Sequence, residues 1–223
     1  MAKLVIGTNK QTVVPAVVKE KQVAMPMSVQ KAKDINGKLV NGSTVIDLNG
    51  ATDIGEYVLM CAYRGATFPA NTNVDFSSLT KISGNTGCQA SFQNCLGITS
   101  VDLGSLTEIS GEYSCNTMFS GCSNLVSVNL SSLTTITGNG CCDGMFAKCS
   151  SLTSLSFPAL TSRSFGSRLN QFRDIIKNVV GCTIHFPSNL DPTGGSTVIS
   201  SLYGYPNFGG TNTVLAFDLP ATE

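Results

Sequence analysis

The residues with the clearest capacity for chemistry in this chain are its cysteines, nine in all. The stretch "CNTMFSGC" places Cys115 and Cys122 seven positions apart. Such a pair could form a disulfide, bind zinc or take part in redox chemistry. On a helix seven residues rise about 10.5 Å, whereas the Cα atoms of a disulfide lie about 4.4–6.8 Å apart. A helical segment would therefore exclude a bridge between these two residues.

The sequence around these cysteines repeats with a period of 27 residues. Three copies align without a gap, beginning at Val74, Val101 and Val128. The third copy is "VNLSSLTTITGNGCCDGMFAKCSSLTS". The columns that are identical in all three copies include Leu79, Leu106 and Leu133; Ile82, Ile109 and Ile136; Gly84, Gly111 and Gly138; Phe92, Phe119 and Phe146. A repeat of this length predicts stacked coils, each a supersecondary unit that buries its apolar face against its neighbours.

Weaker copies flank the three regular ones. We expect coils that begin near residues 46, 74, 101, 128, 155 and 184, followed by a last strand near residue 217. Degraded copies are expected at the ends of an array, where the terminal units act as caps. The sequence therefore predicts a solenoid domain over residues 45–223.

Each copy contains the pattern of a strand, a turn and a short helix. Val128 and Leu130 alternate with polar residues, the period of a strand with one buried face. Gly138 is suited to a turn. Cys115, Phe119 and Cys122, together with Met118, follow the i, i+3, i+4, i+7 spacing of a helical stripe. The later stretch "RLNQFRDIIKNVV" has the same helical spacing and predicts a longer helix over residues 168–180.

The segment "MFSGCSNLVSVNLSSLTTI" resembles the BspA-type leucine-rich repeats of bacteria, over about residues 46–223 and most strongly over 74–157. The resemblance implies an α/β solenoid with a parallel sheet on one face and short helices on the other. It also implies adhesion or recognition of host proteins at a bacterial surface. In one respect the chain departs from the family pattern, since Leu79, Leu106 and Leu133 stand where the commoner repeat has Asn or Cys. No asparagine ladder is therefore expected.

In such an array the cysteines fall into two columns: Cys88, Cys115 and Cys142 form one, and Cys95, Cys122 and Cys149 form the other. Buried thiols pack as small apolar side chains. Zinc favours a shorter cysteine spacing and four converging ligands, and the only histidine, His185, lies far along the chain. We therefore expect core packing, with a redox or metal site and cross-coil disulfides as the alternatives.

The outward strand positions form the candidate ligand face. Its middle column consists of Asp47, Asp75, Asp102, Asn129, Ser156, His185 and Asp218. Carboxylates about 4.8 Å apart on neighbouring strands could contact a cation or a polar ligand, or could simply keep the face solvated. Small neighbours such as Ser100 and Ser127 predict a flat surface suited to a broad partner. A further column of Thr80, Thr107, Thr134 and Thr161 is interpreted as support for strand stacking.

The two ends differ from the repeat. Residues 1–44 predict a small β-rich cap or attachment segment with seven Lys and two acidic residues, a net charge of +5; the remaining seven basic and twelve acidic residues give −5. Lysines on an edge strand discourage aggregation, and charge asymmetry can mark attachment. Near the other end, Tyr203, Tyr205 and Phe208 lie in a Gly- and Pro-rich stretch. We expect these aromatic residues to form either a contact patch for a ligand or a cover for the end of the solenoid.

No catalytic motif is recognisable, so we expect no enzyme, catalytic residue, cofactor or metal. A parallel β-helix enzyme is the nearest enzymatic alternative. The net charge of zero gives no reason to expect nucleic acid as a partner. There is no apolar run of the length needed for a signal peptide or a membrane span. This predicts a cytoplasmic or virion-associated protein, or a cell-surface protein if a leader has been removed. A module that binds protein or glycan is the first hypothesis for the function, and a phage tail-associated structural or receptor-binding protein is the alternative.

Overall fold

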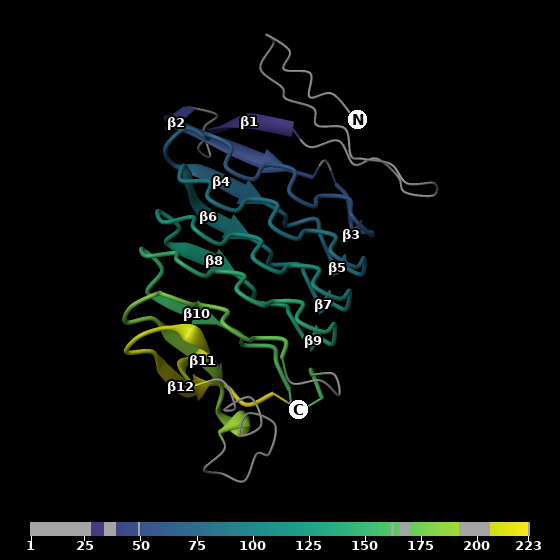
Figure 1. Ribbon diagram of the computed structural model, residues 1–223, viewed down its shortest axis with the longest axis vertical. Helices are drawn as coiled ribbons and strands as arrows, with labels where there is room; N and C mark the ends of the chain where they lie inside the picture. Colours follow the sequence, from purple (N-terminus) through teal and green to yellow (C-terminus); the bar gives the residue numbers. More distant parts are fainter. Residues whose placement is uncertain are drawn as a thin grey trace.

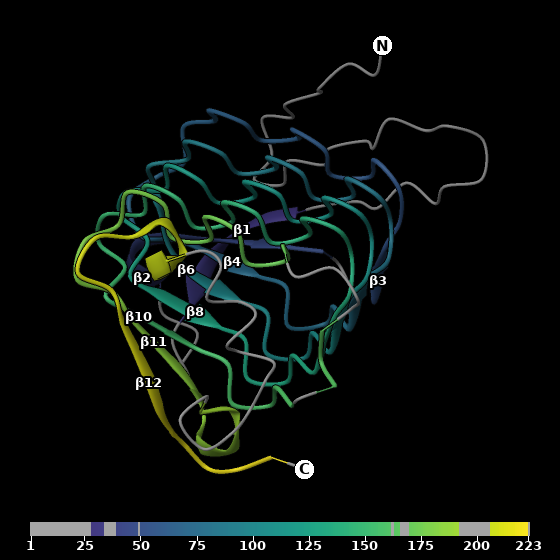
Figure 2. The ribbon, with the colours of Figure 1, turned by 60° about the horizontal axis from the view of Figure 1, so that its bottom comes forward.

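The computed structural model describes residues 28–33, 39–48, 50–161, 163–165, 170–191 and 206–222. These residues form a β-solenoid of about five turns, with the coils stacked along the long axis of the molecule (Figure 1). An oblique view, with the C-terminal end turned forward, shows that successive coils follow similar paths (Figure 2). No helix in this part of the chain is long and apolar enough to cross a bilayer.

Two sheets run along the first part of the solenoid. The larger one has the order β1-β2-β4-β6-β8, and the narrower one has the order β3-β5-β7-β9. The strands of the larger sheet are β1 (Ser28–Lys33), β2 (Leu39–Asp47), β4 (Thr72–Asp75), β6 (Ile98–Asp102) and β8 (Ser127–Asn129). Those of the narrower sheet are β3 (Asp53–Ile54), β5 (Lys81–Ile82), β7 (Glu108–Ile109) and β9 (Thr135–Ile136).

The strand pairing follows the sequence repeat. Ile46 pairs with Val74, Val74 with Val101, and Val101 with Val128, all in parallel. Ile54, Ile82, Ile109 and Ile136 are paired in the same way in the narrower sheet. The exception is β1, which runs antiparallel to β2 at the N-terminal end. Since β2 spans residues 39–47, it contains residues on both sides of the boundary predicted at residues 44–45, which stays a prediction.

The last turns form a third sheet with the order β10-β11-β12. Its strands are β10 (Ser154–Ser156), β11 (Thr183–Pro187) and β12 (Val214–Leu219). The first two lie at the predicted starts near 155 and 184, whereas β12 begins three residues before the start predicted near 217, and Leu215 pairs with Ile184. Two short 3₁₀ helices accompany them, η1 (Ser188–Leu190) and η3 (Pro206–Gly209). The sheets do not merge, because β8 and β10 are not hydrogen-bonded to each other. Val128 on β8 is accordingly only partly buried, whereas Val74 and Val101 are 1% and 2% exposed.

The predicted α/β leucine-rich-repeat fold is wrong, because the described residues contain no α-helix. The segment 112–122 is a series of turns in which Tyr113, Thr117 and Gly121 have φ of 51°, 51° and 79°. A left-handed residue at every fourth position ends each helical turn before the next one can form. The neighbouring coils repeat this geometry, with positive φ at Thr86, Ala90 and Asn94 and at Gly140, Gly144 and Lys148.

Hydrogen bonding explains why the turns are preferred to a helix. The N–H groups of Thr117 and Phe119 donate to Asp143 and Met145 of the next coil, at 2.8 and 2.9 Å. The intervening N–H group of Met118 donates within its own coil to Cys115, at 3.1 Å. An α-helix would use all these donors internally. The tandem turns instead give every second donor to the neighbouring coil and so continue the interstrand bonding around this face.

The longer helix predicted over residues 168–180 is also absent, since residues 171–178 form turns. Asp174 and Asn178 have φ of 54° and 62°. The N–H of Ile176 donates to the carbonyl of Phe208, at 3.2 Å, whereas that of Ile175 donates back to Phe172, at 3.1 Å. The same alternation of bonds within and between coils therefore extends into the last turns.

Aromatic rings stack through the interior of the solenoid. The ring centroids of Phe92 and Phe119 lie 5.3 Å apart with an interplanar angle of 7°. Those of Phe119 and Phe146 lie 5.9 Å apart at 5°. Tyr63 continues the stack in the coil before Phe92, with ring centroids 5.2 Å apart. Because the 27-residue period returns each ring to the same place in the next coil, the sequence column becomes a physical column.

The glycine column has a different role from the predicted turn. A Cβ atom on Gly111 would lie 2.2 Å from the carbonyl oxygen of Gly84, and one on Gly138 would lie 2.1 Å from that of Gly111. Neither residue has a positive φ. Glycine is therefore required here because stacked coils approach each other too closely for any side chain.

Candidate functional site on the strand face

The predicted outward column exists along the larger sheet. Asp47 pairs with Asp75, Asp75 with Asp102, and Asp102 with Asn129. The second part of the column belongs to the separate C-terminal sheet, where Ser156 pairs with His185 and His185 with Ala216. Asp218 nevertheless reaches His185, because its carboxylate lies 2.8 Å from the imidazole Nδ1. The seven predicted residues thus form two groups on two sheets.

The acidic column also closes the turns after the strands. The carboxylate of Asp75 accepts a hydrogen bond from the N–H of Ser77 at 3.0 Å, and that of Asp102 accepts one from Gly104 at 2.9 Å. Asn129 makes the same bond to the N–H of Ser131, at 3.1 Å. Asp and Asn side chains stabilise turns in this way, two residues ahead of themselves. The column therefore has a structural role that the sequence interpretation missed.

One side-chain bond connects neighbouring coils within this column. The amide of Asn129 donates to the carboxylate of Asp102 at 2.8 Å. Because Asn129 is neutral and can donate, it binds the carboxylate of Asp102, whereas an Asp at the same position would repel it. Asp47 and Asp75 lie further along the row and border a shallow depression together with Ser77 and Ser78.

A parallel row of small polar side chains lies beside the acidic one. Asn73 pairs with Ser100, and Ser100 with Ser127; the hydroxyl of Ser100 also lies 2.5 Å from the side-chain oxygen of Asn73. Ser127 and Asn129 are exposed. The surface of this sheet is therefore flat and polar, with hydrogen-bonding groups repeated at the spacing of its strands.

The threonine column supports the stacking of coils, as predicted, over Thr80, Thr107 and Thr134, whereas the hydroxyl of Thr161 lies 3.3 Å from that of Ser164 in its own coil. The hydroxyl of Thr80 donates to the carbonyl of Thr52, that of Thr107 to Thr80, and that of Thr134 to Thr107, at 2.9, 3.0 and 3.1 Å. On the adjacent narrow sheet Lys81 and Glu108 form an ion pair at 2.8 Å. The hydrogen bond between their side chains raises the pKa of Lys81 and lowers that of Glu108.

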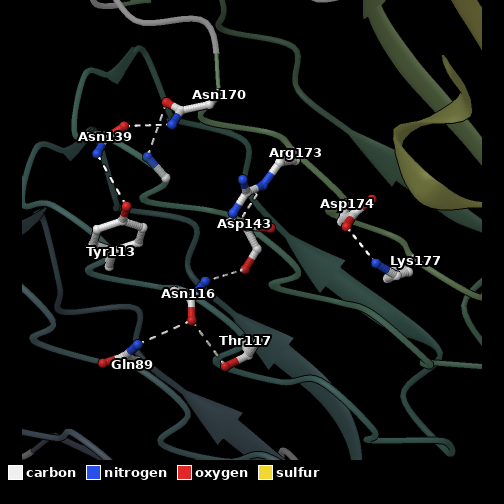
Figure 3. Close-up of polar contacts among 11 residues, drawn as sticks. Gln89, Tyr113, Asn116, Thr117, Asn139, Asp143, Asn170, Arg173, Asp174 and Lys177 are labelled. Carbon is white, nitrogen blue, oxygen red and sulfur yellow. Dashed lines mark hydrogen bonds and ion pairs between the residues drawn. The ribbon is translucent and has the colours of Figure 1, made fainter. Parts of the chain in front are cut away.

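Figure 3 shows a ladder of polar side chains on the turn face. These residues were not predicted as a group from the sequence. The amide of Gln89 donates to Asn116 at 3.2 Å, and Asn116 donates to the backbone carbonyl of Asp143 at 3.2 Å. Asp143 is 8% exposed and accepts a hydrogen bond from Nε of Arg173 at 2.9 Å. The 27-residue spacing of the first three residues could have revealed the ladder. These side chains bond to one another, so we assign them to the stacking of coils.

The buried cysteines belong to the core, as the sequence predicted. All nine are free thiols, and only Cys61 is exposed. Burial raises the pKa of Cys95 to about 11 and that of Cys149 to about 12. The thiols of Cys122 and Cys149 donate to the carbonyls of Phe92 and Phe119 in the preceding coil, at 3.1 and 3.2 Å. The protonated thiols therefore act as hydrogen-bond donors inside the core and link each coil to the preceding one.

The aromatic residues near the C-terminus have different positions. Tyr203 and Tyr205 lie outside the described residues. Phe208 is 2% exposed and packs edge-on against Phe172, with ring centroids 6.1 Å apart. It is therefore a core side chain and does not contribute to an outward surface.

Within the described residues, no group of three or more His, Cys, Asp or Glu side chains has an arrangement that could hold a metal ion. Comparisons of the chain with protein-family models, with curated proteins and with solved structures find no match.

Proposed function

We propose that this protein is a non-enzymatic recognition module that binds a protein or glycan partner through the larger sheet. The supporting observation is the pair of adjacent polar rows on β4, β6 and β8, one with Asn73, Ser100 and Ser127 and the other with Asp75, Asp102 and Asn129. Solenoids commonly use such extended faces for binding. We place the contact on this sheet and exclude Phe208 from it, because that side chain is buried.

The shape of this face favours a broad partner over a small molecule. Small-molecule sites are usually concave and largely apolar, whereas this sheet carries short polar side chains and only a shallow depression at Asp47 and Asp75. Part of the carboxylate capacity is already used to close the turns after the strands. We therefore assign recognition to repeated hydroxyl, amide and carboxylate groups acting together along several strands.

Two features of the sequence support the biological setting that we propose. The repeat resembles the BspA-type sequence pattern, which favours adhesion, and we propose this kinship for the repeat pattern alone. The net charge of +5 on residues 1–44 favours a separate attachment role for that segment. Such an arm suits the second candidate function, a phage tail-associated protein in which the solenoid contacts a receptor.

The proposal is tested by screening the protein on glycan and bacterial or host protein arrays, followed by one surface substitution. Ser127→Arg places a long charged side chain on the exposed polar row without removing a turn-closing Asp or Asn. We expect it to weaken binding at least about tenfold, because it prevents close approach over the neighbouring strands.

The matched control is Thr137→Arg, which makes the same charge change at an exposed residue of the same coil, directly after β9 on the narrower sheet. It should leave the affinity unchanged. Equal losses for the two variants would place the contact elsewhere, and failure of the wild-type protein to bind any arrayed partner would contradict the recognition function.

A further inference from the structure

The last strand of the solenoid has an unpaired edge. β12 follows β11 in the C-terminal sheet, and no described residue pairs with its other side. The N–H of Val214 donates to the carbonyl of Cys182, the residue that precedes β11, at 3.1 Å. Because successive peptide groups of a strand point in opposite directions, the N–H and C=O groups of Leu215 and the N–H group of Phe217 point away from β11. The register with β11 shifts after this point, between Ala216 and Leu219. Figure 2 shows β12 along the outer border of the molecule.

The inward side chains of β12 are also incompletely covered. Leu215 and Phe217 pack against the core but are only partly buried. Their counterparts one coil earlier, Ile184 and Phe186, are 1% and 0% exposed. Phe217 stacks on Phe186 with ring centroids 5.8 Å apart. The preceding pair of this stack, Phe157 and Phe186, has its centroids 5.7 Å apart. Within the described residues, the ring column therefore ends at Phe217, where another β layer could continue it.

The edge lacks the usual protection against strand pairing. Edge strands are commonly protected by lysines or by an internal proline. β12, with the sequence "VLAFDL", contains no basic residue and has its proline only after its end, at Pro220. Its one charge, Asp218, is bonded to His185.

The sequence of β12 is complementary to itself in one antiparallel register. If the two-fold axis passes between two copies of Ala216, Leu215 lies opposite Phe217 of the second copy, and both belong to the inward, apolar face. The outward N–H and C=O groups of Leu215 and the outward N–H of Phe217 then face the second copy and can hydrogen-bond across the junction. Ala216 forms the close, non-hydrogen-bonded pair, in which a small side chain fits.

We propose that β12 pairs antiparallel with β12 of a second copy of this chain, so that two solenoids join end to end. The two C-terminal sheets then become one continuous sheet, and the interiors meet through Leu215 and Phe217. A C2 contact of this kind closes on itself and does not grow into a fibre. Because one strand pair makes a small interface compared with the roughly 1,200–2,000 Å² of stable ones, we expect the dimer to be reversible and to depend on protein concentration. The dimer presents two recognition faces to a partner.

The register is tested by crosslinking. In a Cys61→Ser background, which removes the exposed thiol, Ala216→Cys places two sulfurs across the two-fold axis. Non-hydrogen-bonded antiparallel pairs have Cα atoms about 4.5 Å apart, within the range for a disulfide. Oxidised glutathione, which accepts the two electrons and two protons, should produce a covalent dimer. Ser127→Cys in the same background is the control and should stay monomeric. Failure of Ala216→Cys to crosslink, or equal crosslinking of the two, would overturn the proposal.

Sedimentation over a concentration series provides a second, independent test. The wild-type protein should show reversible dimerisation. Ala216→Lys brings two ammonium groups together at the axis and should raise the dissociation constant at least about tenfold. Val214→Lys lies opposite the partner subunit's Asp218 in this register and should keep the dissociation constant within about threefold or lower it. A monomer at all concentrations, or the same effect of both substitutions, would contradict the pairing.

Discussion

The regular middle coils and the last turns of this solenoid contain similar residues in different surroundings. Phe119 has stacked rings on both sides, Phe92 at 5.3 Å and Phe146 at 5.9 Å. Phe217 has one stacked neighbour among the described residues, Phe186. The middle coils keep a constant 27-residue period, whereas the later strands, which begin at Ser154, Thr183 and Val214, start 29 and 31 residues apart. The comparison shows that a constant period gives each side chain of a column a packed neighbour in the coil before it and in the coil after it. At the end of the array one of these neighbours is missing among the described residues, and apolar surface stays partly exposed.

The largest expected effect concerns the thiols, which are concentrated in the middle coils. Burial raises the pKa of Cys149 to about 12 and of Cys182 to about 11, and it also raises the pKa of Cys115 and Cys122. In the unfolded chain these groups ionise near pH 8.5, so unfolding releases protons above that pH. The free energy of unfolding should therefore be constant below about pH 8 and fall above it, by about 1.4 kcal/mol per pH unit for each buried thiol.

Denaturant titrations between pH 7 and 9.5 measure this slope. Cys122→Ala should make the slope shallower by the contribution of one thiol. A free energy of unfolding that does not depend on pH in this window would mean that the middle columns are open to solvent.

The next effect compares two rings directly. Phe119→Ala should reduce the free energy of unfolding by about 3–5 kcal/mol, as truncation of a buried Phe does. Phe217→Ala should cost about 1–2 kcal/mol, because its ring is only partly covered. Equilibrium unfolding in urea, at concentrations below those that favour dimers, measures both. Equal costs under these conditions would show that the last turn is covered as well as the middle ones.

The smallest effect separates two reasons for glycine. Gly111→Ala should cost about 3 kcal/mol, because its Cβ would lie 2.2 Å from a backbone oxygen that cannot move aside. Gly181 in the last turns has φ of 71° and open space around it, so Gly181→Ala should cost about 1 kcal/mol from backbone strain alone.

Asparagine distinguishes the two cases further. It tolerates a left-handed conformation, so Gly181→Asn should be close to neutral, whereas Gly111→Asn should be at least as harmful as Gly111→Ala. Thermal denaturation of the four variants checks this order, and similar losses at the two positions would contradict the close approach of coils.

Much of the core could be predicted from the repeat. The inward residues, the strand starts and the columns of Phe, Leu, Ile and Cys follow from a 27-residue period combined with alternation along each strand. The helices could not be decided from the same pattern. Cys115, Met118, Phe119 and Cys122 are buried by a turn of four residues as readily as by a helix of 3.6 residues per turn, because two turns are too few to separate these periods.

A local signal for the turns was present but incomplete. Gly140 and Gly144 are four residues apart and have φ of 58° and 61°, yet Thr86 and Thr117 occupy equivalent left-handed positions with φ of 52° and 51°. Threonine is disfavoured in this region, so local preference alone would not place it there. The bonds to the next coil stabilise a conformation that the isolated segment would avoid.

The candidate surface shows the same division. Alternation along the strands placed Asp75, Asp102 and Asn129 on the outward side, and the pairing of strands agrees. Their turn-closing bonds and the break between β8 and β10 depend on backbone positions that only the folded chain defines. The burial of Phe208 similarly depends on contacts with distant residues.

By itself, the sequence determined the 27-residue period, the register of the regular coils and most of the residues that face inward, because these follow from period and polarity along the chain. Tertiary structure alone decided where each backbone N–H finds its acceptor. A donor can bond within its own coil or to the next one, and only stacking brings the second acceptor within reach. That choice replaced the helices by turns and left the edge of β12 without a described partner.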